Sequence, residues 1–480
     1  MRAISGGDKI SVFWIVTSHV LLARAQANPG VRRGPLRKGL HPPMTISSSQ
    51  ETTGAPAKTN GNSSRFYTHR LNNGLQILAE QMPDFESVAV AFHVRTGARD
   101  EADPRLYGVS HFLEHMVFKG TQKRSAEEIS LGFNNIGAEF NAFTSLEQTF
   151  YYARVLGENL APAVELLADM MQPKLDPDEF HTERGVILEE IARSEEVPAS
   201  QAYRWLMRHY FGAHPLGHEV LGSRESIGAM DVEWMRDYWR QRYSANNLIL
   251  SLAGNFHWEQ VMELAARYCS EWPSDEAGRT VQPYMPPAPV TAICTKEKLQ
   301  QEQLLLAFPS LGEEDPDYYA MDLACMVLGD GTGSRLFWNI HQKGLAEAAV
   351  AGLMAFQGTG LVELYATTSP DHAPEVLHVM KQELQGLVEN GVQEDELRRA
   401  KDKVISHIVL NAEHTTSRMR ALPATWLSEG RLKSIEDEVA DVEAVTVEKI
   451  QQTLARFPVM EKLVVTAYGP LDEQGLGFKG

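Results

Sequence analysis

The sequence predicts an α+β protein built from two halves of similar organisation. Two observations lead to this prediction. Strand patterns and helical patterns follow one another in the same coarse order in both halves, and a proline-rich stretch over residues 272–289 lies between them. The chain has 480 residues, of which 43% are hydrophobic, so it is long enough to form two or more domains.

The first half begins with an expected hairpin over residues 66–80, because a turn-forming Asn72-Asn73-Gly74 joins two short strand patterns. Residues 87–94 alternate as a strand, and a strongly apolar helix follows. Helical patterns then cover residues 126–135, 160–171, 177–195, 202–210 and 232–243, and residues 247–253 are expected to form a buried strand.

The second half repeats the order of strand, helix, strand, helices and strand. Its strands are expected at residues 302–307, 360–368 and 463–468, and its helices at residues 318–328, 374–390, 394–410 and 447–455. These patterns divide the chain into an N-terminal extension (1–65), a first domain (66–272), a linker (273–292), a second domain (293–472) and a tail (473–480).

The N-terminal extension leaves the cellular compartment open. Lys9 precedes an apolar run, and Ala25 and Ala27 end Ala-x-Ala sequences, as in the signal peptide of an exported or periplasmic protein. Met44 is an alternative start of translation, which would give a cytoplasmic protein, and residues 45–64 have linker composition. Beyond residue 25 no apolar stretch is as long as a membrane span, so we expect no stable membrane insertion of the body.

Charge and cysteine content argue against several classes of protein. A formal net charge of −18 argues against binding to nucleic acid or to an anionic membrane surface. Cys269, Cys294 and Cys325 form no Cys-x-x-Cys pair, so neither a disulfide scaffold nor a thiolate zinc site is expected. The glycine-rich residues 329–337 match no phosphate-binding spacing and are expected to form a turn before a helix.

The pentad His111-Phe112-Leu113-Glu114-His115 is the strongest functional signal. Side chains at i and i+4 share one face of a helix with Cβ atoms ~5–6 Å apart, a span that one Zn²⁺ with Zn–N bonds of ~2.0–2.1 Å can bridge. Glu114 lies on the same face, where it can reach water at the metal and act as a general base. The alternative is two histidines with a glutamate nearby by chance, and a third ligand is needed to decide.

Acidic candidates for that ligand lie within residues 183–191. Glu183 and Glu190 are seven residues apart and therefore share one stripe of the helix expected there, while Ile187 and Ile191 belong to its apolar face. Composition alone favours a solvated helix face for so many acids.

His111 to His115, Glu190 and the stretch between them together resemble the inverzincin zinc peptidases of the pitrilysin and mitochondrial-processing-peptidase family. The resemblance covers about residues 66–470. It implies two homologous α+β domains, each an antiparallel or mixed sheet with helices on one side, facing each other across a cleft. The second half has no such pentad, so one Zn²⁺ per chain is expected.

The resemblance also implies a role for each residue of the motif. His111, His115 and Glu190 are expected to bind zinc, Glu114 to activate water, and Glu183 to hydrogen-bond a ligand histidine. Glu189 adjoins Glu190 but points about 100° away around a helix, so we assign it to the solvated side.

Residues 137–144 and 149–155 are expected to form a hairpin that ends in an edge strand. In the family this edge binds an extended substrate as an added strand, so the resemblance implies that Asn141 and Ala142 bind peptide backbone. The alternative is an ordinary strand without a ligand.

The chain departs from the family at an arginine and a tyrosine, seven residues apart, that grip the substrate backbone. It has Ile340 and Glu347 at these positions, or His341 at the arginine position if the register shifts by one residue. Neither isoleucine nor glutamate supplies a cationic or phenolic donor. The resemblance is therefore to the zinc-bearing subunit of a two-chain enzyme whose homologous partner carries the arginine and tyrosine; a homodimer that uses other donors, such as His341 or Arg335, is the alternative.

The sequence thus predicts a zinc-dependent metalloendopeptidase that hydrolyses peptides or unfolded polypeptide segments. A non-catalytic scaffold of the same fold is less favoured, because such relatives are expected to have broken metal motifs and this motif is complete. A structural zinc would require four ligands, and only three are found.

Overall fold

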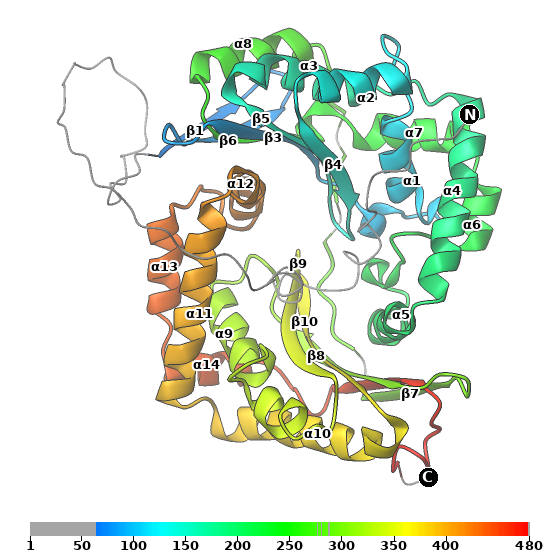
Figure 1. Ribbon diagram of the computed structural model, residues 1–480, viewed down its shortest axis with the longest axis vertical. Coiled ribbons are helices and arrows are strands. Elements are labelled where there is room, and N and C mark those ends of the chain that lie inside the picture. The colour runs from blue at the N-terminus through cyan, green and yellow to red at the C-terminus, as the bar shows by residue number, and fades with distance from the viewer. Residues whose placement is uncertain (1–63, 276, 280, 287–288, 479–480) are drawn as a thin grey trace, which may run out of the picture.

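The computed structural model describes residues 64–275, 277–279, 281–286 and 289–478. The expectations for the signal peptide and for the start at Met44 lie outside these residues. Two sheets lie one above the other, and helices surround them (Figure 1). Within the described part of the chain, no helix has both the length and the hydropathy needed to cross a membrane.

The first sheet has six strands in the order β1-β2-β6-β3-β5-β4. Strands β2 and β6 run parallel, and all other neighbours are antiparallel. The strands are β1 (Arg65–Arg70), β2 (Gln76–Gln81), β3 (Ser87–Val94), β4 (Glu139–Thr144), β5 (Thr149–Leu156) and β6 (Leu248–Gly254).

The second sheet has five strands in the order β7-β11-β8-β10-β9, with β7 and β11 parallel and the other neighbours antiparallel. This order and these directions reproduce β2-β6-β3-β5-β4 of the first sheet strand by strand, so the expected duplication is present in the topology. The strands are β7 (Val290–Thr295), β8 (Glu302–Ser310), β9 (Ala348–Phe356), β10 (Thr359–Thr368) and β11 (Val464–Gly469).

Apart from α5 and α12, the helices of each half lie on one side of the sheet of that half (Figure 1). In the first half the helices are α1 (Val109–Val117), α2 (Ala126–Asn135), α3 (Leu160–Met170), α4 (Pro177–Glu195), α5 (Pro198–Phe211), α6 (Arg224–Ala229), α7 (Val232–Arg242) and α8 (Trp258–Cys269). In the second half they are α9 (Tyr318–Gly329), α10 (Ala373–Asn390), α11 (Glu394–Ala412), α12 (Thr415–Glu429), α13 (Ile435–Glu443) and α14 (Val447–Leu454).

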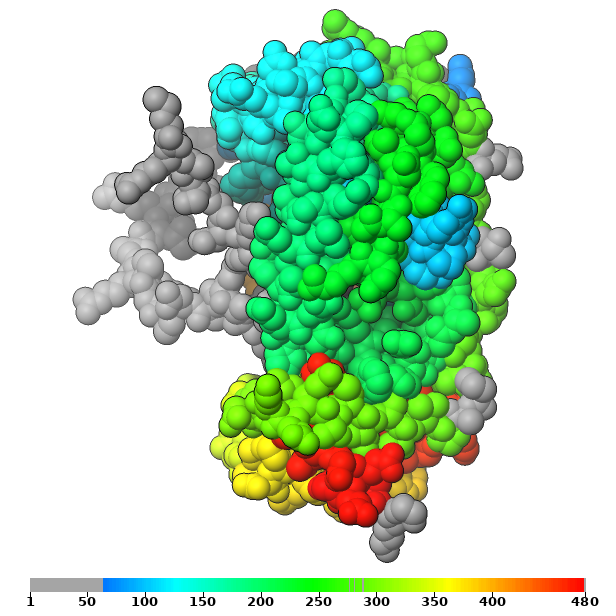
Figure 2. Space-filling model, turned by 90° about the vertical axis from the view of Figure 1, so that its right-hand side faces the viewer, coloured from blue at the N-terminus to red at the C-terminus, as the bar shows by residue number. Residues whose placement is uncertain are grey.

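Two helices are exchanged between the halves and cover the opposite face of each sheet. Helix α5 packs on β8 and β11 of the second sheet, and α12 packs on β2, β3 and β6 of the first. On the face shown in Figure 2, the green surface of the first half lies directly on the yellow-green and red surface of the second half. The exchange holds the two halves together around the space between the sheets.

The sequence patterns did not predict β7, β9, α6, α8, α12 or α13. Strand β9 is rich in alanine, contains Gly352, and has only Val350 and Phe356 of the β-branched and aromatic residues that mark a strand. Helix α12 contains Pro423 and begins with threonines, which are weak helix formers. Both elements are stabilised mainly by packing, which a local pattern does not report.

Candidate metal centre

The backbone around Gly108 fixes the N-terminus of α1. Gly108 has φ +91°, and a Cβ atom there would lie 2.7 Å from the Leu221 carbonyl oxygen, so only glycine fits without strain. The buried Glu101 carboxylate accepts hydrogen bonds from the backbone N–H groups of Gly108 (2.7 Å) and Ser110 (2.9 Å). These bonds satisfy donors that the helix leaves unpaired and fix the direction in which α1 enters the core.

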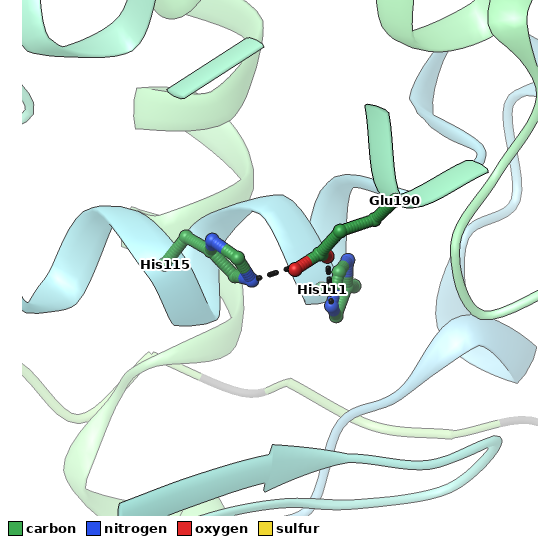
Figure 3. A group of neighbouring side chains, drawn as sticks. All are labelled: His111, His115 and Glu190. Carbon is green, nitrogen blue, oxygen red and sulfur yellow. Dashed lines mark ion pairs between the residues drawn. The ribbon is translucent and has the colours of Figure 1, made fainter. Parts of the chain in front are cut away.

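Helices α1 and α4 bring His111, His115 and Glu190 together (Figure 3). Glu190 Oε2 lies 3.7 Å from His111 Nε2 and 3.6 Å from His115 Nε2. Glu190 belongs to the buried face of α4 together with Phe180, which places a carboxylate opposite the two imidazoles of α1.

This arrangement fits a zinc ion. Two ligand atoms at ~2.1 Å from an ion at a tetrahedral angle lie about 3.4 Å apart, close to the separations between the Glu190 carboxylate and the two imidazoles. Two imidazoles and one carboxylate also form a donor set of the kind that catalytic zinc takes, with one position left for water. Among the described residues this is the one group of three or more histidine, cysteine or acidic side chains so arranged.

Glu183 lies on the far side of His115. Its Oε2 is 3.1 Å from His115 Nδ1, and its Oε1 is 2.5 Å from Lys119 Nζ. Burial opposes the charged forms, but the hydrogen bond between the two side chains, helped by nearby charges, lowers the pKa of Glu183 and raises that of His115. The contact fixes the ring so that Nε2 faces Glu190, as the expected role requires.

Glu114 lies beside the group and receives a hydrogen bond from the Thr144 hydroxyl, with an oxygen–oxygen distance of 2.6 Å. Burial raises the pKa of Glu114 to about 7, although the Thr144 hydrogen bond acts in the opposite direction. His111 is also buried, and burial lowers its pKa well below the ordinary value. Glu189 is exposed, as its position next to Glu190 predicted.

Asn141 and Ala142 lie on β4, whose outer edge pairs with no other strand in the described part of the chain. Asn141 is exposed, and its Oδ1 accepts a hydrogen bond from the Ala142 N–H at 2.9 Å. A peptide added along this edge would compete with the Asn141 side chain for that donor. Thr144, three residues further on, is the residue that contacts Glu114.

A cavity of about 2370 Å³ lies between the two halves and contains the whole group. His111, Glu114, His115, Glu183 and Glu190 line it from the first half, together with the edge strand β4. From the second half, it is lined by residues of α9, α11, α12 and the end of β9. The cavity is large enough for an extended peptide, and residues of both halves line it.

The residues at the expected positions of the arginine and tyrosine do not line this cavity. Ile340 is fully buried, and His341 and Glu347 are exposed elsewhere. Arg335 forms a two-pronged ion pair with Glu396, at 2.8 Å and 2.7 Å, so its guanidinium is already engaged.

Sequence reasoning missed three residues that support the group: Glu101, Lys119 and Thr144. Thr144 lies within the hairpin that the sequence singled out, and Lys119 is one helical turn after His115. Glu101 precedes α1 in the chain without any local signal. Their partners are distant in sequence or in another element, so only the folded chain reveals the contacts.

Comparisons with known proteins agree with this architecture. The family model described as insulinase (peptidase family M16) matches residues 76–224. The model described as the peptidase M16 inactive domain matches residues 229–404. The first match includes both histidines and Glu190, and the second includes most of the half that lacks the pentad.

Individual relatives extend over nearly the same region. An uncharacterized zinc protease of Streptomyces coelicolor is 33% identical over 412 residues, which are 84% of this chain and 89% of the relative. One of Bacillus subtilis is 30% identical, covering 83% of this chain and 97% of the relative.

Solved structures share the fold. A peptidase M16 inactive domain from Pseudomonas fluorescens has a TM-score of 0.79 at 21% identity, covering 85% of this chain and 98% of that one. A protease from Helicobacter pylori has a TM-score of 0.77 at 23% identity, covering 84% and 99% of the two chains.

Proposed function

This chain belongs to peptidase family M16, and on that basis we propose that it is a zinc-dependent metalloendopeptidase that hydrolyses peptides or unfolded polypeptide segments. The observation that carries the proposal is the convergence of two imidazoles and a carboxylate, with Glu114 beside them, in a cavity lined by both halves. The family relatives are named zinc proteases, which supports zinc as the metal.

His111, His115 and Glu190 would hold the ion. When bound, zinc supplies a Lewis acid that polarises a carbonyl and lowers the pKa of water. Glu114 accepts a proton from the attacking water and returns it to the leaving amine. The Thr144 hydroxyl donates a hydrogen bond to the Glu114 carboxylate and so holds it in position.

The substrate would bind as an additional strand along β4. Backbone hydrogen bonds then hold the peptide extended beside Glu114 and the two histidines, with Asn141 and Ala142 at the contact. A folded domain is too bulky to reach β4 in a cavity lined by both halves. The substrates are therefore peptides and unfolded segments.

We further propose that the chain is the metal-bearing subunit of a heterodimer. The proposal is supported by the residues at the arginine and tyrosine positions: Ile340 is buried, Glu347 is acidic, and neither lines the cavity. A homologous partner that supplies a cation and a phenol would complete the polarising donors. A self-sufficient homodimer is the second candidate, because the exposed His341 is free to face another copy.

The test is cleavage of a quenched fluorescent peptide library by the zinc-loaded chain, alone and together with a co-encoded homologue. The Glu114→Gln variant is the control, because it keeps the three candidate ligands but lacks the base; we expect a loss of about 10²–10⁴-fold. Activity only with the partner supports the heterodimer, and activity of the chain alone supports the homodimer. Absence of cleavage in both cases, despite bound zinc, would contradict a peptidase and favour a scaffold.

A further inference from the structure

A row of stacked rings crosses the face of the first sheet opposite α1. His93 on β3 stacks on Phe150 of β5 with ring centroids 4.3 Å apart, and Phe150 stacks on Phe143 of β4 at 5.0 Å. All three side chains line the cavity between the halves. The row therefore reaches from the interior of the sheet to the edge strand β4.

Helix α12 places a cation over this row. The guanidinium carbon of Arg420 lies 5.1 Å from the ring centre of Phe143 and 4.6 Å from that of Tyr152. Arg420 lines the cavity, is half-buried, and forms no ion pair with any described carboxylate. An arginine over an aromatic ring keeps its N–H donors available for a carboxylate.

Two polar groups, one at each end of this arrangement, have no described hydrogen-bond partner. His93 is 1% exposed, and neither of its ring nitrogens has a hydrogen-bond partner among the described residues. The Nε atom of Arg420 is likewise buried without a described partner. Buried donors without partners are rare in folded proteins, and a ligand that accepts hydrogen bonds is one explanation.

From this arrangement we propose that Arg420, held over Phe143 and Tyr152, forms a subsite for a carboxylate of the bound peptide. The inference rests on the proposed function, because it requires a peptide along β4. Side chains of a strand alternate between its two faces. If one substrate residue points toward α1, its neighbours point toward Phe143 and Arg420. The carboxylate belongs to an Asp or Glu side chain at such a position, or to the C-terminus of the peptide.

The test is binding rather than cleavage, in the zinc-loaded full chain that carries Glu114→Gln. Labelled peptides that differ only by Glu against Gln at one position, scanned along the sequence, are compared by fluorescence anisotropy. A second pair differs only by a free or an amidated C-terminus. A hydrogen bond to a charged group corresponds to about tenfold or more in affinity. If the subsite binds a side-chain carboxylate, we expect tighter binding of the Glu peptide at alternate positions of the scan. If it binds the C-terminal carboxylate, we expect tighter binding of the peptide with the free C-terminus.

Substitution of the arginine sharpens the result. The affinity ratio compares the peptide that has the carboxylate with the peptide that lacks it. In Arg420→Gln this ratio should fall to about one, and in Arg420→Lys part of the preference should remain. Arg431 lines the same cavity but pairs with Glu429 at 3.2 Å, so Arg431→Gln should keep the wild-type ratio. A purely structural role of Arg420 would change both affinities equally and leave the ratio unchanged, which would overturn the inference.

Failure of this inference and failure of the proposed function are distinguishable. Equal affinity within every peptide pair, including no detectable binding of either peptide, would overturn the carboxylate subsite. Absence of hydrolysis by the chain with Glu114 intact, alone or with a partner, would overturn the peptidase. A carboxylate preference in binding without hydrolysis would support the subsite and reject the peptidase.

Discussion

The two halves share one topology, yet only one carries the candidate metal centre. Along the chain, helix α1 follows β3 and precedes β4, and α9 follows β8 and precedes β9, which occupy the corresponding places in the second sheet. When Met116-Val117 is aligned with Met326-Val327, the pentad residues His111, Glu114 and His115 correspond to Met321, Ala324 and Cys325. These three residues of α9 are buried in the second core.

The partner helices differ in the same way. Helices α4 and α11 each contain 19 residues, and alignment from their first residues places Ala400 opposite Glu183 and His407 opposite Glu190. The carboxylates of Glu183 and Glu190 therefore have no counterpart at the aligned positions of α11. The same fold therefore carries a polar group on α1 and α4 in the first half and buried apolar residues on α9 in the second half. A metal centre at this place requires ligands from both helices of a pair.

The strongest way to break this comparison is to remove the third ligand. In Glu190→Gln the carboxylate opposite the two imidazoles is lost, so zinc content should fall far below one per chain and peptidase activity by about 10³-fold or more. Metal analysis of the purified protein and cleavage of a fluorescent peptide measure the two effects. The matched change in the second half, His407→Gln, should leave zinc content at the wild-type value. Full zinc occupancy in Glu190→Gln would refute the assignment.

The exchanged helices offer a second comparison. Arg418 on α12 is 4% exposed and pairs with Glu80 of β2 at 2.7 Å, whereas α5 is held by aromatic packing and by neutral hydrogen bonds, among them those from Tyr210 to Gly360 and from Trp205 to Ala292. Arg418→Met leaves a buried carboxylate unpaired and should reduce the free energy of unfolding by about 3–5 kcal/mol. Tyr210→Phe removes one neutral hydrogen bond and should cost about 1 kcal/mol. Urea unfolding followed by fluorescence measures both, and equal effects would contradict this difference.

A smaller effect is expected at Glu183, which contacts a candidate ligand without being one. Glu183→Gln removes the charge that orients His115, and zinc affinity should fall about 10–100-fold. Competition with a chelator of known affinity measures the change. The α11 residue aligned with Glu183 is Ala400, so only the first half is expected to show an effect of this position on zinc affinity. An unchanged affinity would contradict a role of Glu183 in orienting the ring.

The smallest expected effect is a pH dependence that belongs to the second half. Strand β8 begins with the buried Glu302, where β3 begins with Ser87. Burial raises the pKa of Glu302 from 4.5 to about 7. The folded chain therefore binds this proton more tightly than the unfolded chain, and the stabilisation is present below about pH 4.5 and lost as the pH rises through about 7.

Glu302→Gln should consequently flatten the decline of the urea midpoint between pH 5 and pH 8. Glu302 Oε1 has no described hydrogen-bond partner, and Oε2 accepts one from the Leu471 N–H, so a neutral amide is compatible with the environment. Ser87→Ala in the first sheet is the control and should leave the slope unchanged. Identical slopes in Glu302→Gln and the wild type would contradict the prediction.

Features that depend on local periodicity could be predicted without a structure. The spacing of His111 and His115 and the stripe of Glu183 and Glu190 follow from the geometry of one helix, so these residues could be singled out without a structure. The long amphipathic helices and the alternating strands were predictable for the same reason. The duplication could be expected from the order of elements, although the sequences of α1 and α9 have little in common.

Contacts between distant groups could be recognised only in the folded chain. They join segments that are far apart in the chain or belong to different elements. Examples are the pairing of Thr144 with Glu114, the cap that Glu101 provides for α1, and the position of Arg420 over Phe143. Strand β9 and helix α12 have weak local propensities and form because packing against the rest of the fold stabilises them. Local propensity extends over one turn or one strand, whereas a cavity between two halves depends on contacts that only the folded chain makes.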